Sequence, residues 1–363
     1  MNKKVLHIIT TLDPGGAEKQ LLEMIRAFRP DYTHEIIWVK GPGKLKSTLS
    51  DYSIEANSLK VKLKHLICEL AKGRHSMYSS KYIIHAHLPR AELLAVLLSF
   101  VWGSRLVVSK HNMERMWPHG PKSLSRILAK IVYRRATRVI CISKAVRNFL
   151  IAIGELEVES NKLSVVYYGI ASNGENNFTN QATVKYKPGE VIRIGTLARL
   201  EPQKDLKTLV KAAALLRDQG VKAHFQVHGE GTERFKLESL VRSLNLEDYV
   251  SIGQKLEYVG DFFRDIDLFV LPSLYEGFGL VILEAAQKGV PVLLSETDVA
   301  KELVGTSTEL TFPIGDYVQL ANKILHLFSH SNELLCLKAR TFDIIAKFDI
   351  ELTITQMVAI YES

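Results

Sequence analysis

The segment "LFVLPSLYEGFGLVILEAAQKGVPVLLS", residues 268–295, contains one complete strand–helix–strand unit. Its two ends, 268–273 and 290–295, are short apolar runs that predict buried strands. Strands that are apolar on both faces are typical of parallel sheets covered by helices on both sides. The segment therefore predicts an α/β fold.

The same segment places two glutamates eight residues apart. Glu276 lies beside a pair of glycines, and Glu284 lies between Leu283 and Ala285. Burying an unpaired carboxylate costs several kcal/mol, so a buried Glu284 needs either a ligand or a buried Lys or Arg partner. The residues alone leave both alternatives open.

Strand-like and helix-like segments alternate along the whole chain, in two series. Strands are expected at 4–10, 34–39, 82–87, 105–110 and 138–143, and again at 191–198, 223–229, 250–253, 268–273 and 290–295. Amphipathic helices are expected between them, for example at 16–28, 90–100 and 206–220. The polar stretch 171–190 has no periodicity and separates the two series.

A chain of 363 residues also favours two domains over one. We expect two doubly wound, Rossmann-like domains, 1–180 and 186–344, with a helix at about 345–363 crossing back to the first. Open parallel sheets bind ligands at the C-terminal ends of their strands, so a cleft between the domains is expected there.

Charge is distributed unevenly between the two halves. Residues 1–180 contain 27 Lys and Arg against 14 Asp and Glu, a net charge of +13, whereas residues 181–363 contain 20 against 25, a net charge of −5. Such asymmetry indicates that one half faces an anionic partner.

No acidic residue occurs from 116 to 154, where basic residues recur every four positions among apolar ones. The basic residues are Lys122, Arg126, Lys130, Arg134 and Arg138. This pattern suits a helix on an anionic membrane surface or against a pyrophosphate-linked lipid. A solvated basic helix over the core explains it equally well. Nucleic acid is not favoured, because no binding motif or stacking aromatic residues accompany the charge.

Targeting and redox signals favour the cytoplasm. The first apolar run is too short for a signal peptide, and the longest, 93–102, is shorter than the ~20 residues that span a bilayer. The three cysteines form no CxxC pair, so neither a disulfide framework nor a zinc site is indicated.

A loop with two cations follows the first strand of the second series. In "RIGTLARLEPQKDLKTLV", residues 193–210, Arg199 and Lys204 precede a helix. Forked donors, a point charge and free helix amides together suit a phosphate. The alternative is a pair of solvated loop cations.

The first half offers a glycine loop and a histidine pair. In "DPGGAEK", Gly15 and Gly16 permit close approach of a ligand, although a tight strand-to-helix turn needs glycine anyway. His85 and His87 end a strand and face the same side. They could bind a metal, but no third ligand has suitable spacing. The "DID" motif at 265–267 precedes an apolar strand and is interpreted as structural. No metal site is expected.

Several motifs together resemble the retaining glycosyltransferases of family 4 (glycosyl transferases group 1). They are "DPGGAEK", "IIHAHLPRAE", "CISKAV" and "VVYYGI" in the first half, and "GTLARLEPQKD", "HGEGTERFKLESL" and the Glu-x7-Glu segment in the second. The resemblance covers nearly the whole chain, and the Glu-x7-Glu segment is its most specific part. It implies the two-domain GT-B fold and a nucleotide-sugar donor bound mainly by the second domain.

The resemblance also assigns roles to individual residues. The expected catalytic residues are His87, Glu276, Arg199 and Lys204. The expected donor-binding residues are Gly16, Arg199, Lys204, Glu276, Phe278, Gly279, Leu280 and Glu284, with Glu284 on the ribose hydroxyls. The expected acceptor-binding residues are Gly15, Arg90, His111 and Lys144.

The implied function is transfer of a hexose or N-acetylhexosamine from a nucleotide-diphosphate sugar, first of all a UDP-sugar, to a hydroxyl of a lipid-linked or surface glycan. No other cofactor is expected. The protein would act in lipopolysaccharide or capsule biosynthesis, peripherally on the inner face of the cell membrane. Two alternatives remain: a nucleotide-sugar epimerase on the same fold, and a non-catalytic nucleotide-sugar or membrane-binding module.

Overall fold

The computed structural model describes residues 3–28, 30–50, 54–60, 82–157, 161–171, 190–256, 259–305 and 307–363. The chain divides into a first unit, Met1–Ala171 with Asp349–Ser363, and a second unit, Ser172–Phe348. The expected linker at 171–190 and the domain limits at 180 and 186 lie almost entirely outside the described residues. The C-terminal return to the first unit begins at Asp349 rather than at 345.

The first unit contains one parallel sheet whose described strands have the order β3-β2-β1-β4-β5-β6-β7. The strands are β1 (Lys3–Ile9), β2 (Tyr32–Trp38), β3 (Glu55–Ser58), β4 (Tyr82–His87), β5 (Arg105–Lys110), β6 (Arg138–Cys141) and β7 (Leu163–Val165). The helices are α1 (Gly16–Ala27), α2 (Lys46–Ser50), α4 (Pro89–Val101), α5 (Lys122–Arg135), α6 (Lys144–Ala152) and α14 (Ile350–Glu362).

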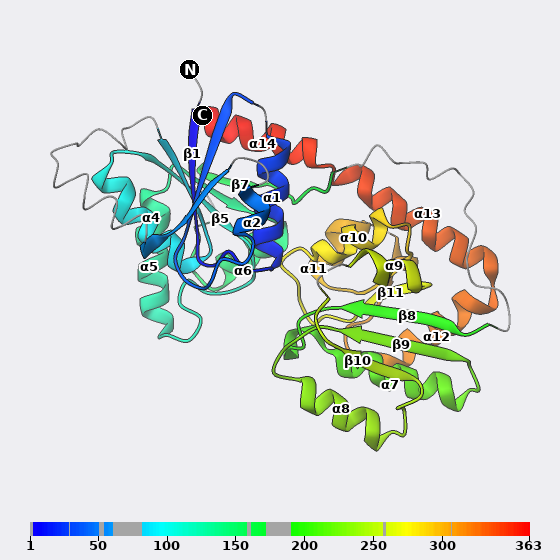
Figure 1. Ribbon diagram of the computed structural model, residues 1–363. Helices are drawn as coiled ribbons and strands as arrows, with labels where there is room; N and C mark the ends of the chain where they lie inside the picture. Colours follow the sequence, from blue (N-terminus) through cyan, green and yellow to red (C-terminus); the bar gives the residue numbers. More distant parts are fainter. Residues whose placement is uncertain are drawn as a thin grey trace. The chain divides into compact units, whose positions relative to one another are not determined.

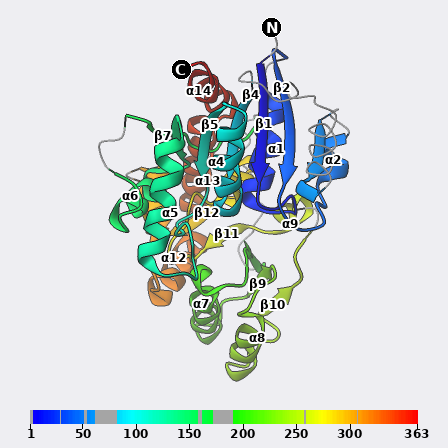
Figure 2. The ribbon, with the colours of Figure 1, turned by 90° about the vertical axis from the view of Figure 1, so that its left-hand side faces the viewer.

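Helices cover both faces of this sheet (Figures 1 and 2). α1 and α14 lie side by side on one face, and α4 and α5 lie side by side on the other. Buried side chains of α14, including Ile354, Met357 and Tyr361, join the core formed by α1 and the central strands. The last thirteen-residue helix is therefore an integral part of the first unit.

The second unit contains a parallel sheet of the order β10-β9-β8-β11-β12-β13. Its strands are β8 (Ile192–Leu197), β9 (Ala223–His228), β10 (Val250–Gly253), β11 (Leu268–Leu271), β12 (Val292–Ser295) and β13 (Thr311–Phe312). Its α-helices are α7 (Leu206–Asp218), α8 (Arg234–Ser243), α9 (Gly260–Asp265), α10 (Leu280–Gln287), α11 (Asp298–Val304), α12 (Tyr317–Ser329) and α13 (Ser331–Lys347). Short 3-10 turns are η1 (Pro202–Lys204) and η2 (Thr308–Leu310).

These two sheets confirm the expected doubly wound architecture, with differences at the edges. Strands β3, β7 and β13 are not predicted, because edge strands of two to four residues are too short for a hydrophobic pattern. Helix α5 ends at Arg135, so Arg138 lies on β6 and is not part of the basic helix. The return helix starts late because α13 continues to Lys347 and the Asp349 side chain then caps α14.

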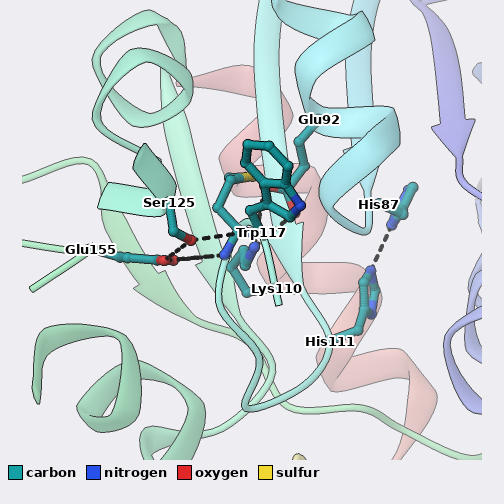
Figure 3. A network of polar contacts seen from close by, with 8 residues as sticks. His87, Glu92, Lys110, His111, Trp117, Ser125 and Glu155 are labelled. Atoms are coloured by element: carbon teal, nitrogen blue, oxygen red, sulfur yellow. Dashed lines mark hydrogen bonds and ion pairs between the residues drawn. The ribbon is translucent and has the colours of Figure 1, made fainter. Parts of the chain in front are cut away.

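One ion pair lies completely inside the first unit. Lys110, at the end of β5, places its ammonium nitrogen 3.0 Å from a carboxylate oxygen of Glu92 on α4, and both side chains are no more than 1% exposed (Figure 3). Burial opposes the positive charge, but the nearby carboxylates outweigh it and raise the pKa of Lys110. The pair joins α4 to the sheet just where the strands end.

A second buried carboxylate fixes the start of α5. Glu155 accepts hydrogen bonds from the backbone N–H of Met116 at 3.0 Å and from the hydroxyl of Ser125 at 2.6 Å (Figure 3). The Ser125 oxygen in turn accepts from the backbone N–H of Trp117. No side chain caps α5 at its N-cap residue, Pro121. The side chains of Glu155 and Ser125 instead hold the preceding loop against the first turn of the helix.

We expect Lys110→Met to lower the free energy of unfolding by about 3–5 kcal/mol, because it leaves the Glu92 carboxylate buried without its partner. The double variant Lys110→Met, Glu92→Leu should lose less than either single variant. Urea unfolding followed by circular dichroism measures both. The exposed pair Lys3–Glu362 is the control, and Glu362→Gln should change stability by less than about 1 kcal/mol. Equal losses at the two pairs would contradict the interpretation.

Candidate functional site

The second unit has its topological switch point between β8 and β11. From β8 the sheet continues through β9 to β10 on one side, and from β11 through β12 to β13 on the other. Loops that follow two such neighbouring strands diverge and leave a crevice at the carboxyl edge, where ligands bind in this class of fold. The loop after β8 carries Arg199 and Lys204, and the loop after β11 carries Glu276.

Lys204 and Glu276 meet across this switch point. The Lys204 ammonium lies 2.5 Å from Oε1 of Glu276, and the Ser273 hydroxyl donates to the same oxygen at 2.5 Å. All three side chains are buried. The two predicted residues are thus brought together, and Ser273, three residues before Glu276, completes the cluster. A buried ammonium held on one carboxylate oxygen keeps N–H donors for an anion.

Arg199 is exposed, and its guanidinium donates to the side chain of Gln203 at 3.3 Å. Gln203 also connects the two loops. Its side-chain amide donates to the backbone carbonyl of Tyr275 at 2.8 Å, and its backbone carbonyl accepts from the backbone N–H of Leu274. The loop after β8 is therefore tied to the loop after β11 by backbone and side chain. Arg199 projects from a fixed loop into solvent.

Helix α10 starts at Leu280, four residues after Glu276. Its N-cap is Gly279, whose φ of 82° lies in the left-handed region that favours glycine. The Phe278 side chain is buried and stacks edge to face on Phe348, so only its backbone can contact a ligand. Helix starts bind anions in proteins through the backbone amides of their first turn.

Glu284 lies on α10 and is partly exposed. The expectation from its apolar neighbours was a buried carboxylate. The helix instead buries Ile282, Leu283, Ala285 and Ala286, while Glu284 retains access to solvent. Its charge therefore does not require a buried cationic partner.

The "DID" motif has a structural explanation. Asp267, just before β11, accepts a hydrogen bond from the backbone N–H of Arg193 on β8 at 2.9 Å, and the Arg193 guanidinium lies 3.4 Å from the same oxygen. Asp265 is the last residue of α9. The first aspartate thus ends a helix, and the second aligns the two strands of the switch point.

The first unit has its own switch point, between β1 and β4. Four predicted residues follow strands that end at this edge of the sheet. Gly15 is the N-cap of α1 after β1, Arg90 opens α4 after β4, His111 follows β5, and Lys144 opens α6 after β6. The sheet therefore gathers all four expected acceptor residues at one edge.

A carboxylate that the sequence analysis missed occupies the start of α1. Glu18 is buried, and the Thr11 hydroxyl donates to its Oε1 at 2.5 Å. A side chain at Gly15 would bring its Cβ to 2.4 Å from Oε2 of Glu18. A side chain at Gly15 would therefore displace the Glu18 carboxylate. Gly16, expected to bind the donor, begins the helix that carries this negative charge.

His87 belongs to a line of buried imidazoles, most of which the sequence analysis did not identify. His7 on β1 lies between His34 on β2, at 2.9 Å between ring nitrogens, and His87 on β4, at 3.1 Å. The other nitrogen of His87 lies 2.9 Å from Nε2 of His111 (Figure 3). His111 then bonds to the hydroxyl of Tyr168. His87 is 2% exposed, and hydrogen bonds engage both its nitrogens.

His85 points to the same face, as its alternation with His87 predicts, but has other partners. Its Nδ1 lies 2.7 Å from the Tyr361 hydroxyl, and its Nε2 lies 2.7 Å from the Ser109 hydroxyl. Nitrogens of His7, His85 and His87 all lie within 4.8 Å of one another. The expectation that no third ligand has suitable spacing overlooked His7, which the pairing of β1 with β4 aligns with His85.

A cavity of about 30 Å³ borders these imidazoles, between the sheet and helices α1 and α14. Gln20 of α1 lines it and is 4% exposed, and its Nε2 has no hydrogen-bond partner among the described residues. The cavity has room for about one water molecule.

Burial keeps the imidazoles neutral. Desolvation lowers the pKa of His34 to about 4 and, with the nearby Lys110 charge, that of His111 to about 3. Desolvation and neighbouring imidazoles also lower the pKa values of His7 and His85 well below 6.5, and desolvation and His111 do the same for His87. In the unfolded chain these groups titrate near pH 6.5.

The signs of these shifts predict acid sensitivity. Below about pH 6.5 the unfolded chain binds protons that the folded chain excludes, so stability falls as pH falls, down to about pH 3–4, by about 1.4 kcal/mol per pH unit for each such group. We expect His34→Gln to reduce this slope by the contribution of one group, about 1.4 kcal/mol per pH unit. Urea unfolding between pH 7.5 and 5 measures the slope. Equal slopes in His34→Gln and the wild type would refute the explanation.

Comparisons with known proteins agree with both halves of the chain. The family profile Glycosyltransferase Family 4 matches residues 14–173, and Glycosyl transferases group 1 matches residues 177–340. EpsF of Bacillus subtilis (strain 168), itself named only provisionally as a glycosyltransferase, is 26% identical over 347 residues, 87% of this chain and 86% of its own. The O-antigen biosynthesis glycosyltransferase WclY of Escherichia coli is 27% identical over 241 residues, 64% of this chain and 65% of its own.

The fold is shared with solved structures. HepE of Anabaena in complex with UDP-glucose superposes with a TM-score of 0.79 at 21% identity, covering 99% of both chains. Both family profiles, one on each parallel α/β unit, and this fold lead to the same assignment. The chain belongs to the family 4, group 1 glycosyltransferases of the GT-B fold.

Proposed function

We propose that the protein is a retaining glycosyltransferase that moves a hexose or N-acetylhexosamine from a UDP-sugar to a hydroxyl of a lipid-linked or surface glycan. The observation that carries the proposal is the cluster of Lys204, Glu276 and Ser273 at the switch point of the second unit, with Arg199 beside it. The UDP-glucose complex of HepE supports the choice of donor, and the O-antigen enzyme WclY supports the choice of acceptor class.

The donor diphosphate would bind to Lys204, Arg199 and the first amides of α10. Lys204 is already positioned by Glu276, so little side-chain freedom is lost when it binds an anion. The exposed Arg199 supplies forked donors for a second contact. Glu284, which is partly exposed on α10, would accept hydrogen bonds from the ribose hydroxyls. Glu276 and the backbone at Phe278–Leu280 would contact the sugar and the phosphates.

In the proposed reaction the bond between the anomeric carbon and the diphosphate oxygen breaks, and the acceptor oxygen bonds to that carbon on the same face. The acceptor's proton passes to the leaving diphosphate. Negative charge grows on the diphosphate as the bond breaks, so the cations and helix amides stabilise the transition state more than the bound donor. This charge stabilisation would serve without a metal ion.

The acceptor would bind at the carboxyl edge of the first unit, near Gly15, Arg90, His111 and Lys144. Arg90 and Lys144 are exposed cations at helix starts and suit the phosphates of a lipid-linked glycan. His111 is partly exposed, whereas His87 is not, so His111 is the imidazole that meets a substrate first. His87 would contact the sugar or acceptor only after giving up one of its present hydrogen bonds.

A neighbouring surface suits peripheral attachment to an anionic membrane. Among the described residues, no helix is both long and apolar enough to cross a bilayer. The adjacent helices α4 and α5 nevertheless expose large apolar side chains, among them Leu97 (60%), Phe100 (66%) and Ile127 (54%). We name this the α4–α5 surface: Leu93, Leu97, Phe100, Val101, Leu124, Ile127 and Ile131, with the exposed cations Lys122, Arg126, Lys130 and Arg134.

The spacing on each helix gathers these side chains into stripes. On α4, residues 93, 97, 100 and 101 lie on one face, and on α5 the apolar positions 124, 127 and 131 adjoin the basic row. Apolar side chains beside cations suit the boundary between headgroups and acyl chains of an anionic bilayer. We propose that this surface holds the enzyme at the inner face of the cell membrane.

We expect Arg199→Ala and Lys204→Ala each to weaken UDP binding by about 1.5–3 kcal/mol, the range for hydrogen bonds to charged groups. Isothermal titration of UDP and GDP with each variant measures the loss. Lys207→Ala is the matched control, because Lys207 is an exposed cation one residue into α7 and its side chain is 66% exposed. Unchanged affinity in the first two variants, with wild type binding one nucleotide, would refute the donor site.

Membrane binding should require the basic row of the α4–α5 surface. Each cation near an anionic surface contributes about 1 kcal/mol, so the triple variant Lys122→Glu, Lys130→Glu, Arg134→Glu should bind anionic vesicles at least roughly 100-fold more weakly. Arg126 is spared, because it donates to the carbonyl of Ile153. Sedimentation with phosphatidylserine-containing vesicles measures binding, which should also fall with added salt.

The control for this experiment reverses three exposed lysines of the second unit, Lys207, Lys211 and Lys236, which should leave binding intact. Leu97→Ser with Phe100→Ser should weaken binding without changing the net charge. Equal sedimentation with neutral and anionic vesicles would show that α5 is a solvated helix.

A further inference from the structure

Three buried imidazoles of the first unit and the partly exposed His111 form one continuous hydrogen-bonded line. It runs from His34 through His7 and His87 to His111 and ends on the Tyr168 hydroxyl. Each inner imidazole uses one nitrogen toward each neighbour. His85 lies beside the line but bonds to Tyr361 and Ser109 instead.

A neutral imidazole has one N–H donor and one acceptor nitrogen. In a line of such rings, a donor must always face an acceptor, so the tautomer of one ring fixes that of the next. Only two arrangements satisfy every link. In one, each ring carries its proton on Nδ1 and His111 donates to Tyr168. In the other, each carries it on Nε2 and Tyr168 donates to His111.

The two ends of the line distinguish these arrangements. Nε2 of His34 is buried and has no hydrogen-bond partner among the described residues. With the proton on Nε2, His34 would bury an unsatisfied N–H donor, and buried N–H groups without partners are rare in folded proteins. With the proton on Nδ1, the same position holds only an acceptor lone pair.

The Tyr168 end favours the same direction. Burial and then the negative charge of Glu18 raise the pKa of Tyr168. A negative charge favours the orientation in which the hydroxyl proton turns toward it and the oxygen accepts from His111.

We propose that His34, His7, His87 and His111 form a single directional chain in which every imidazole is protonated on Nδ1, with Tyr168 as the positioning residue that fixes its direction. Tyr168, His7 and His34 then set which nitrogen of His87 and His111 carries a proton, at a distance from any substrate. The role of this tautomer in sugar transfer rests on the proposed function, but the chain itself does not.

Nuclear magnetic resonance of the full-length protein labelled with ¹⁵N-histidine tests the chain without any activity. Near pH 7.5, all four imidazoles should show a protonated Nδ1 and an unprotonated Nε2. Averaged nitrogen signals, or protonated Nε2 on His87 or His111, would overturn the proposal. So would stoichiometric zinc in the purified protein with these nitrogens unprotonated, because a metal ligand cannot carry the proton.

The variant Tyr168→Phe tests transmission along the chain. It removes the acceptor for His111, so the two arrangements each leave one buried donor unsatisfied and should both be populated. The separation between the two nitrogen signals should then shrink at His7 and His34, which lie further along the chain, beyond His111 and His87. A change confined to His111 would refute a connected chain.

Tyr361→Phe is the matched control, because it removes the hydroxyl that bonds His85, outside the chain. It should change the His85 signals and leave the four tautomers intact. With a glycosyl acceptor in hand, Tyr168→Phe should lower kcat and leave UDP affinity unchanged. If the wild-type signals are as expected but kcat is unchanged, the chain stands as a tautomer-fixing device and the role of these imidazoles in transfer fails.

Discussion

The contact between Lys204 and Glu276 joins the two strands on which the second unit depends. Strands β8 and β11 are paired, but they belong to opposite halves of the sheet, so the loops that follow them diverge. The hydrogen bonds of the sheet do not hold these two loops together. The ion pair and the Gln203 bridge tie these two loops together, and the Ser273 hydroxyl holds Glu276 in place. The carboxylate of Glu276 thereby positions the positive charge of Lys204 before any ligand binds, as the proposed anion site requires.

The switch point of the first unit contains a different set of polar groups. Its switch point contains imidazoles and hydroxyls that are buried and neutral. Neutral donors and acceptors tolerate a dry interior when each has a partner, whereas isolated charges do not. The buried Lys110 and Glu92 nearby neutralise each other as an ion pair. The unit can therefore place polar groups next to its core at the cost of acid sensitivity rather than of unpaired charge.

Features of the fold and the site that follow from a local sequence pattern could be predicted, whereas those that depend on the pairing of distant strands could not. The strands, the two units and the loops with Arg199, Lys204 and Glu276 follow from local patterns, since each lies within one β–α segment. His7 and His34 could not be found in this way, because they reach His87 only through the pairing of β1 with β2 and β4. A lone histidine inside the apolar run "KVLHIIT" was the available signal. The burial expected for Glu284 was wrong for the opposite reason, because it relied on neighbours in sequence. In a helix, residues next to each other in sequence point in different directions, so apolar neighbours do not imply a buried side chain.

The distribution of charge shows why net charge is a poor guide to an individual site. The half with −5 contains the cluster proposed to bind a diphosphate, and the half with +13 contains the neutral imidazoles. Binding a compact anion needs two or three donors at hydrogen-bond distance, which the sum of charges over a domain does not report. Attraction to a broad anionic surface depends instead on many exposed cations acting together, within the screening length. The excess charge of the first half therefore bears on the α4–α5 surface, and the local pair Lys204 and Arg199 bears on the donor.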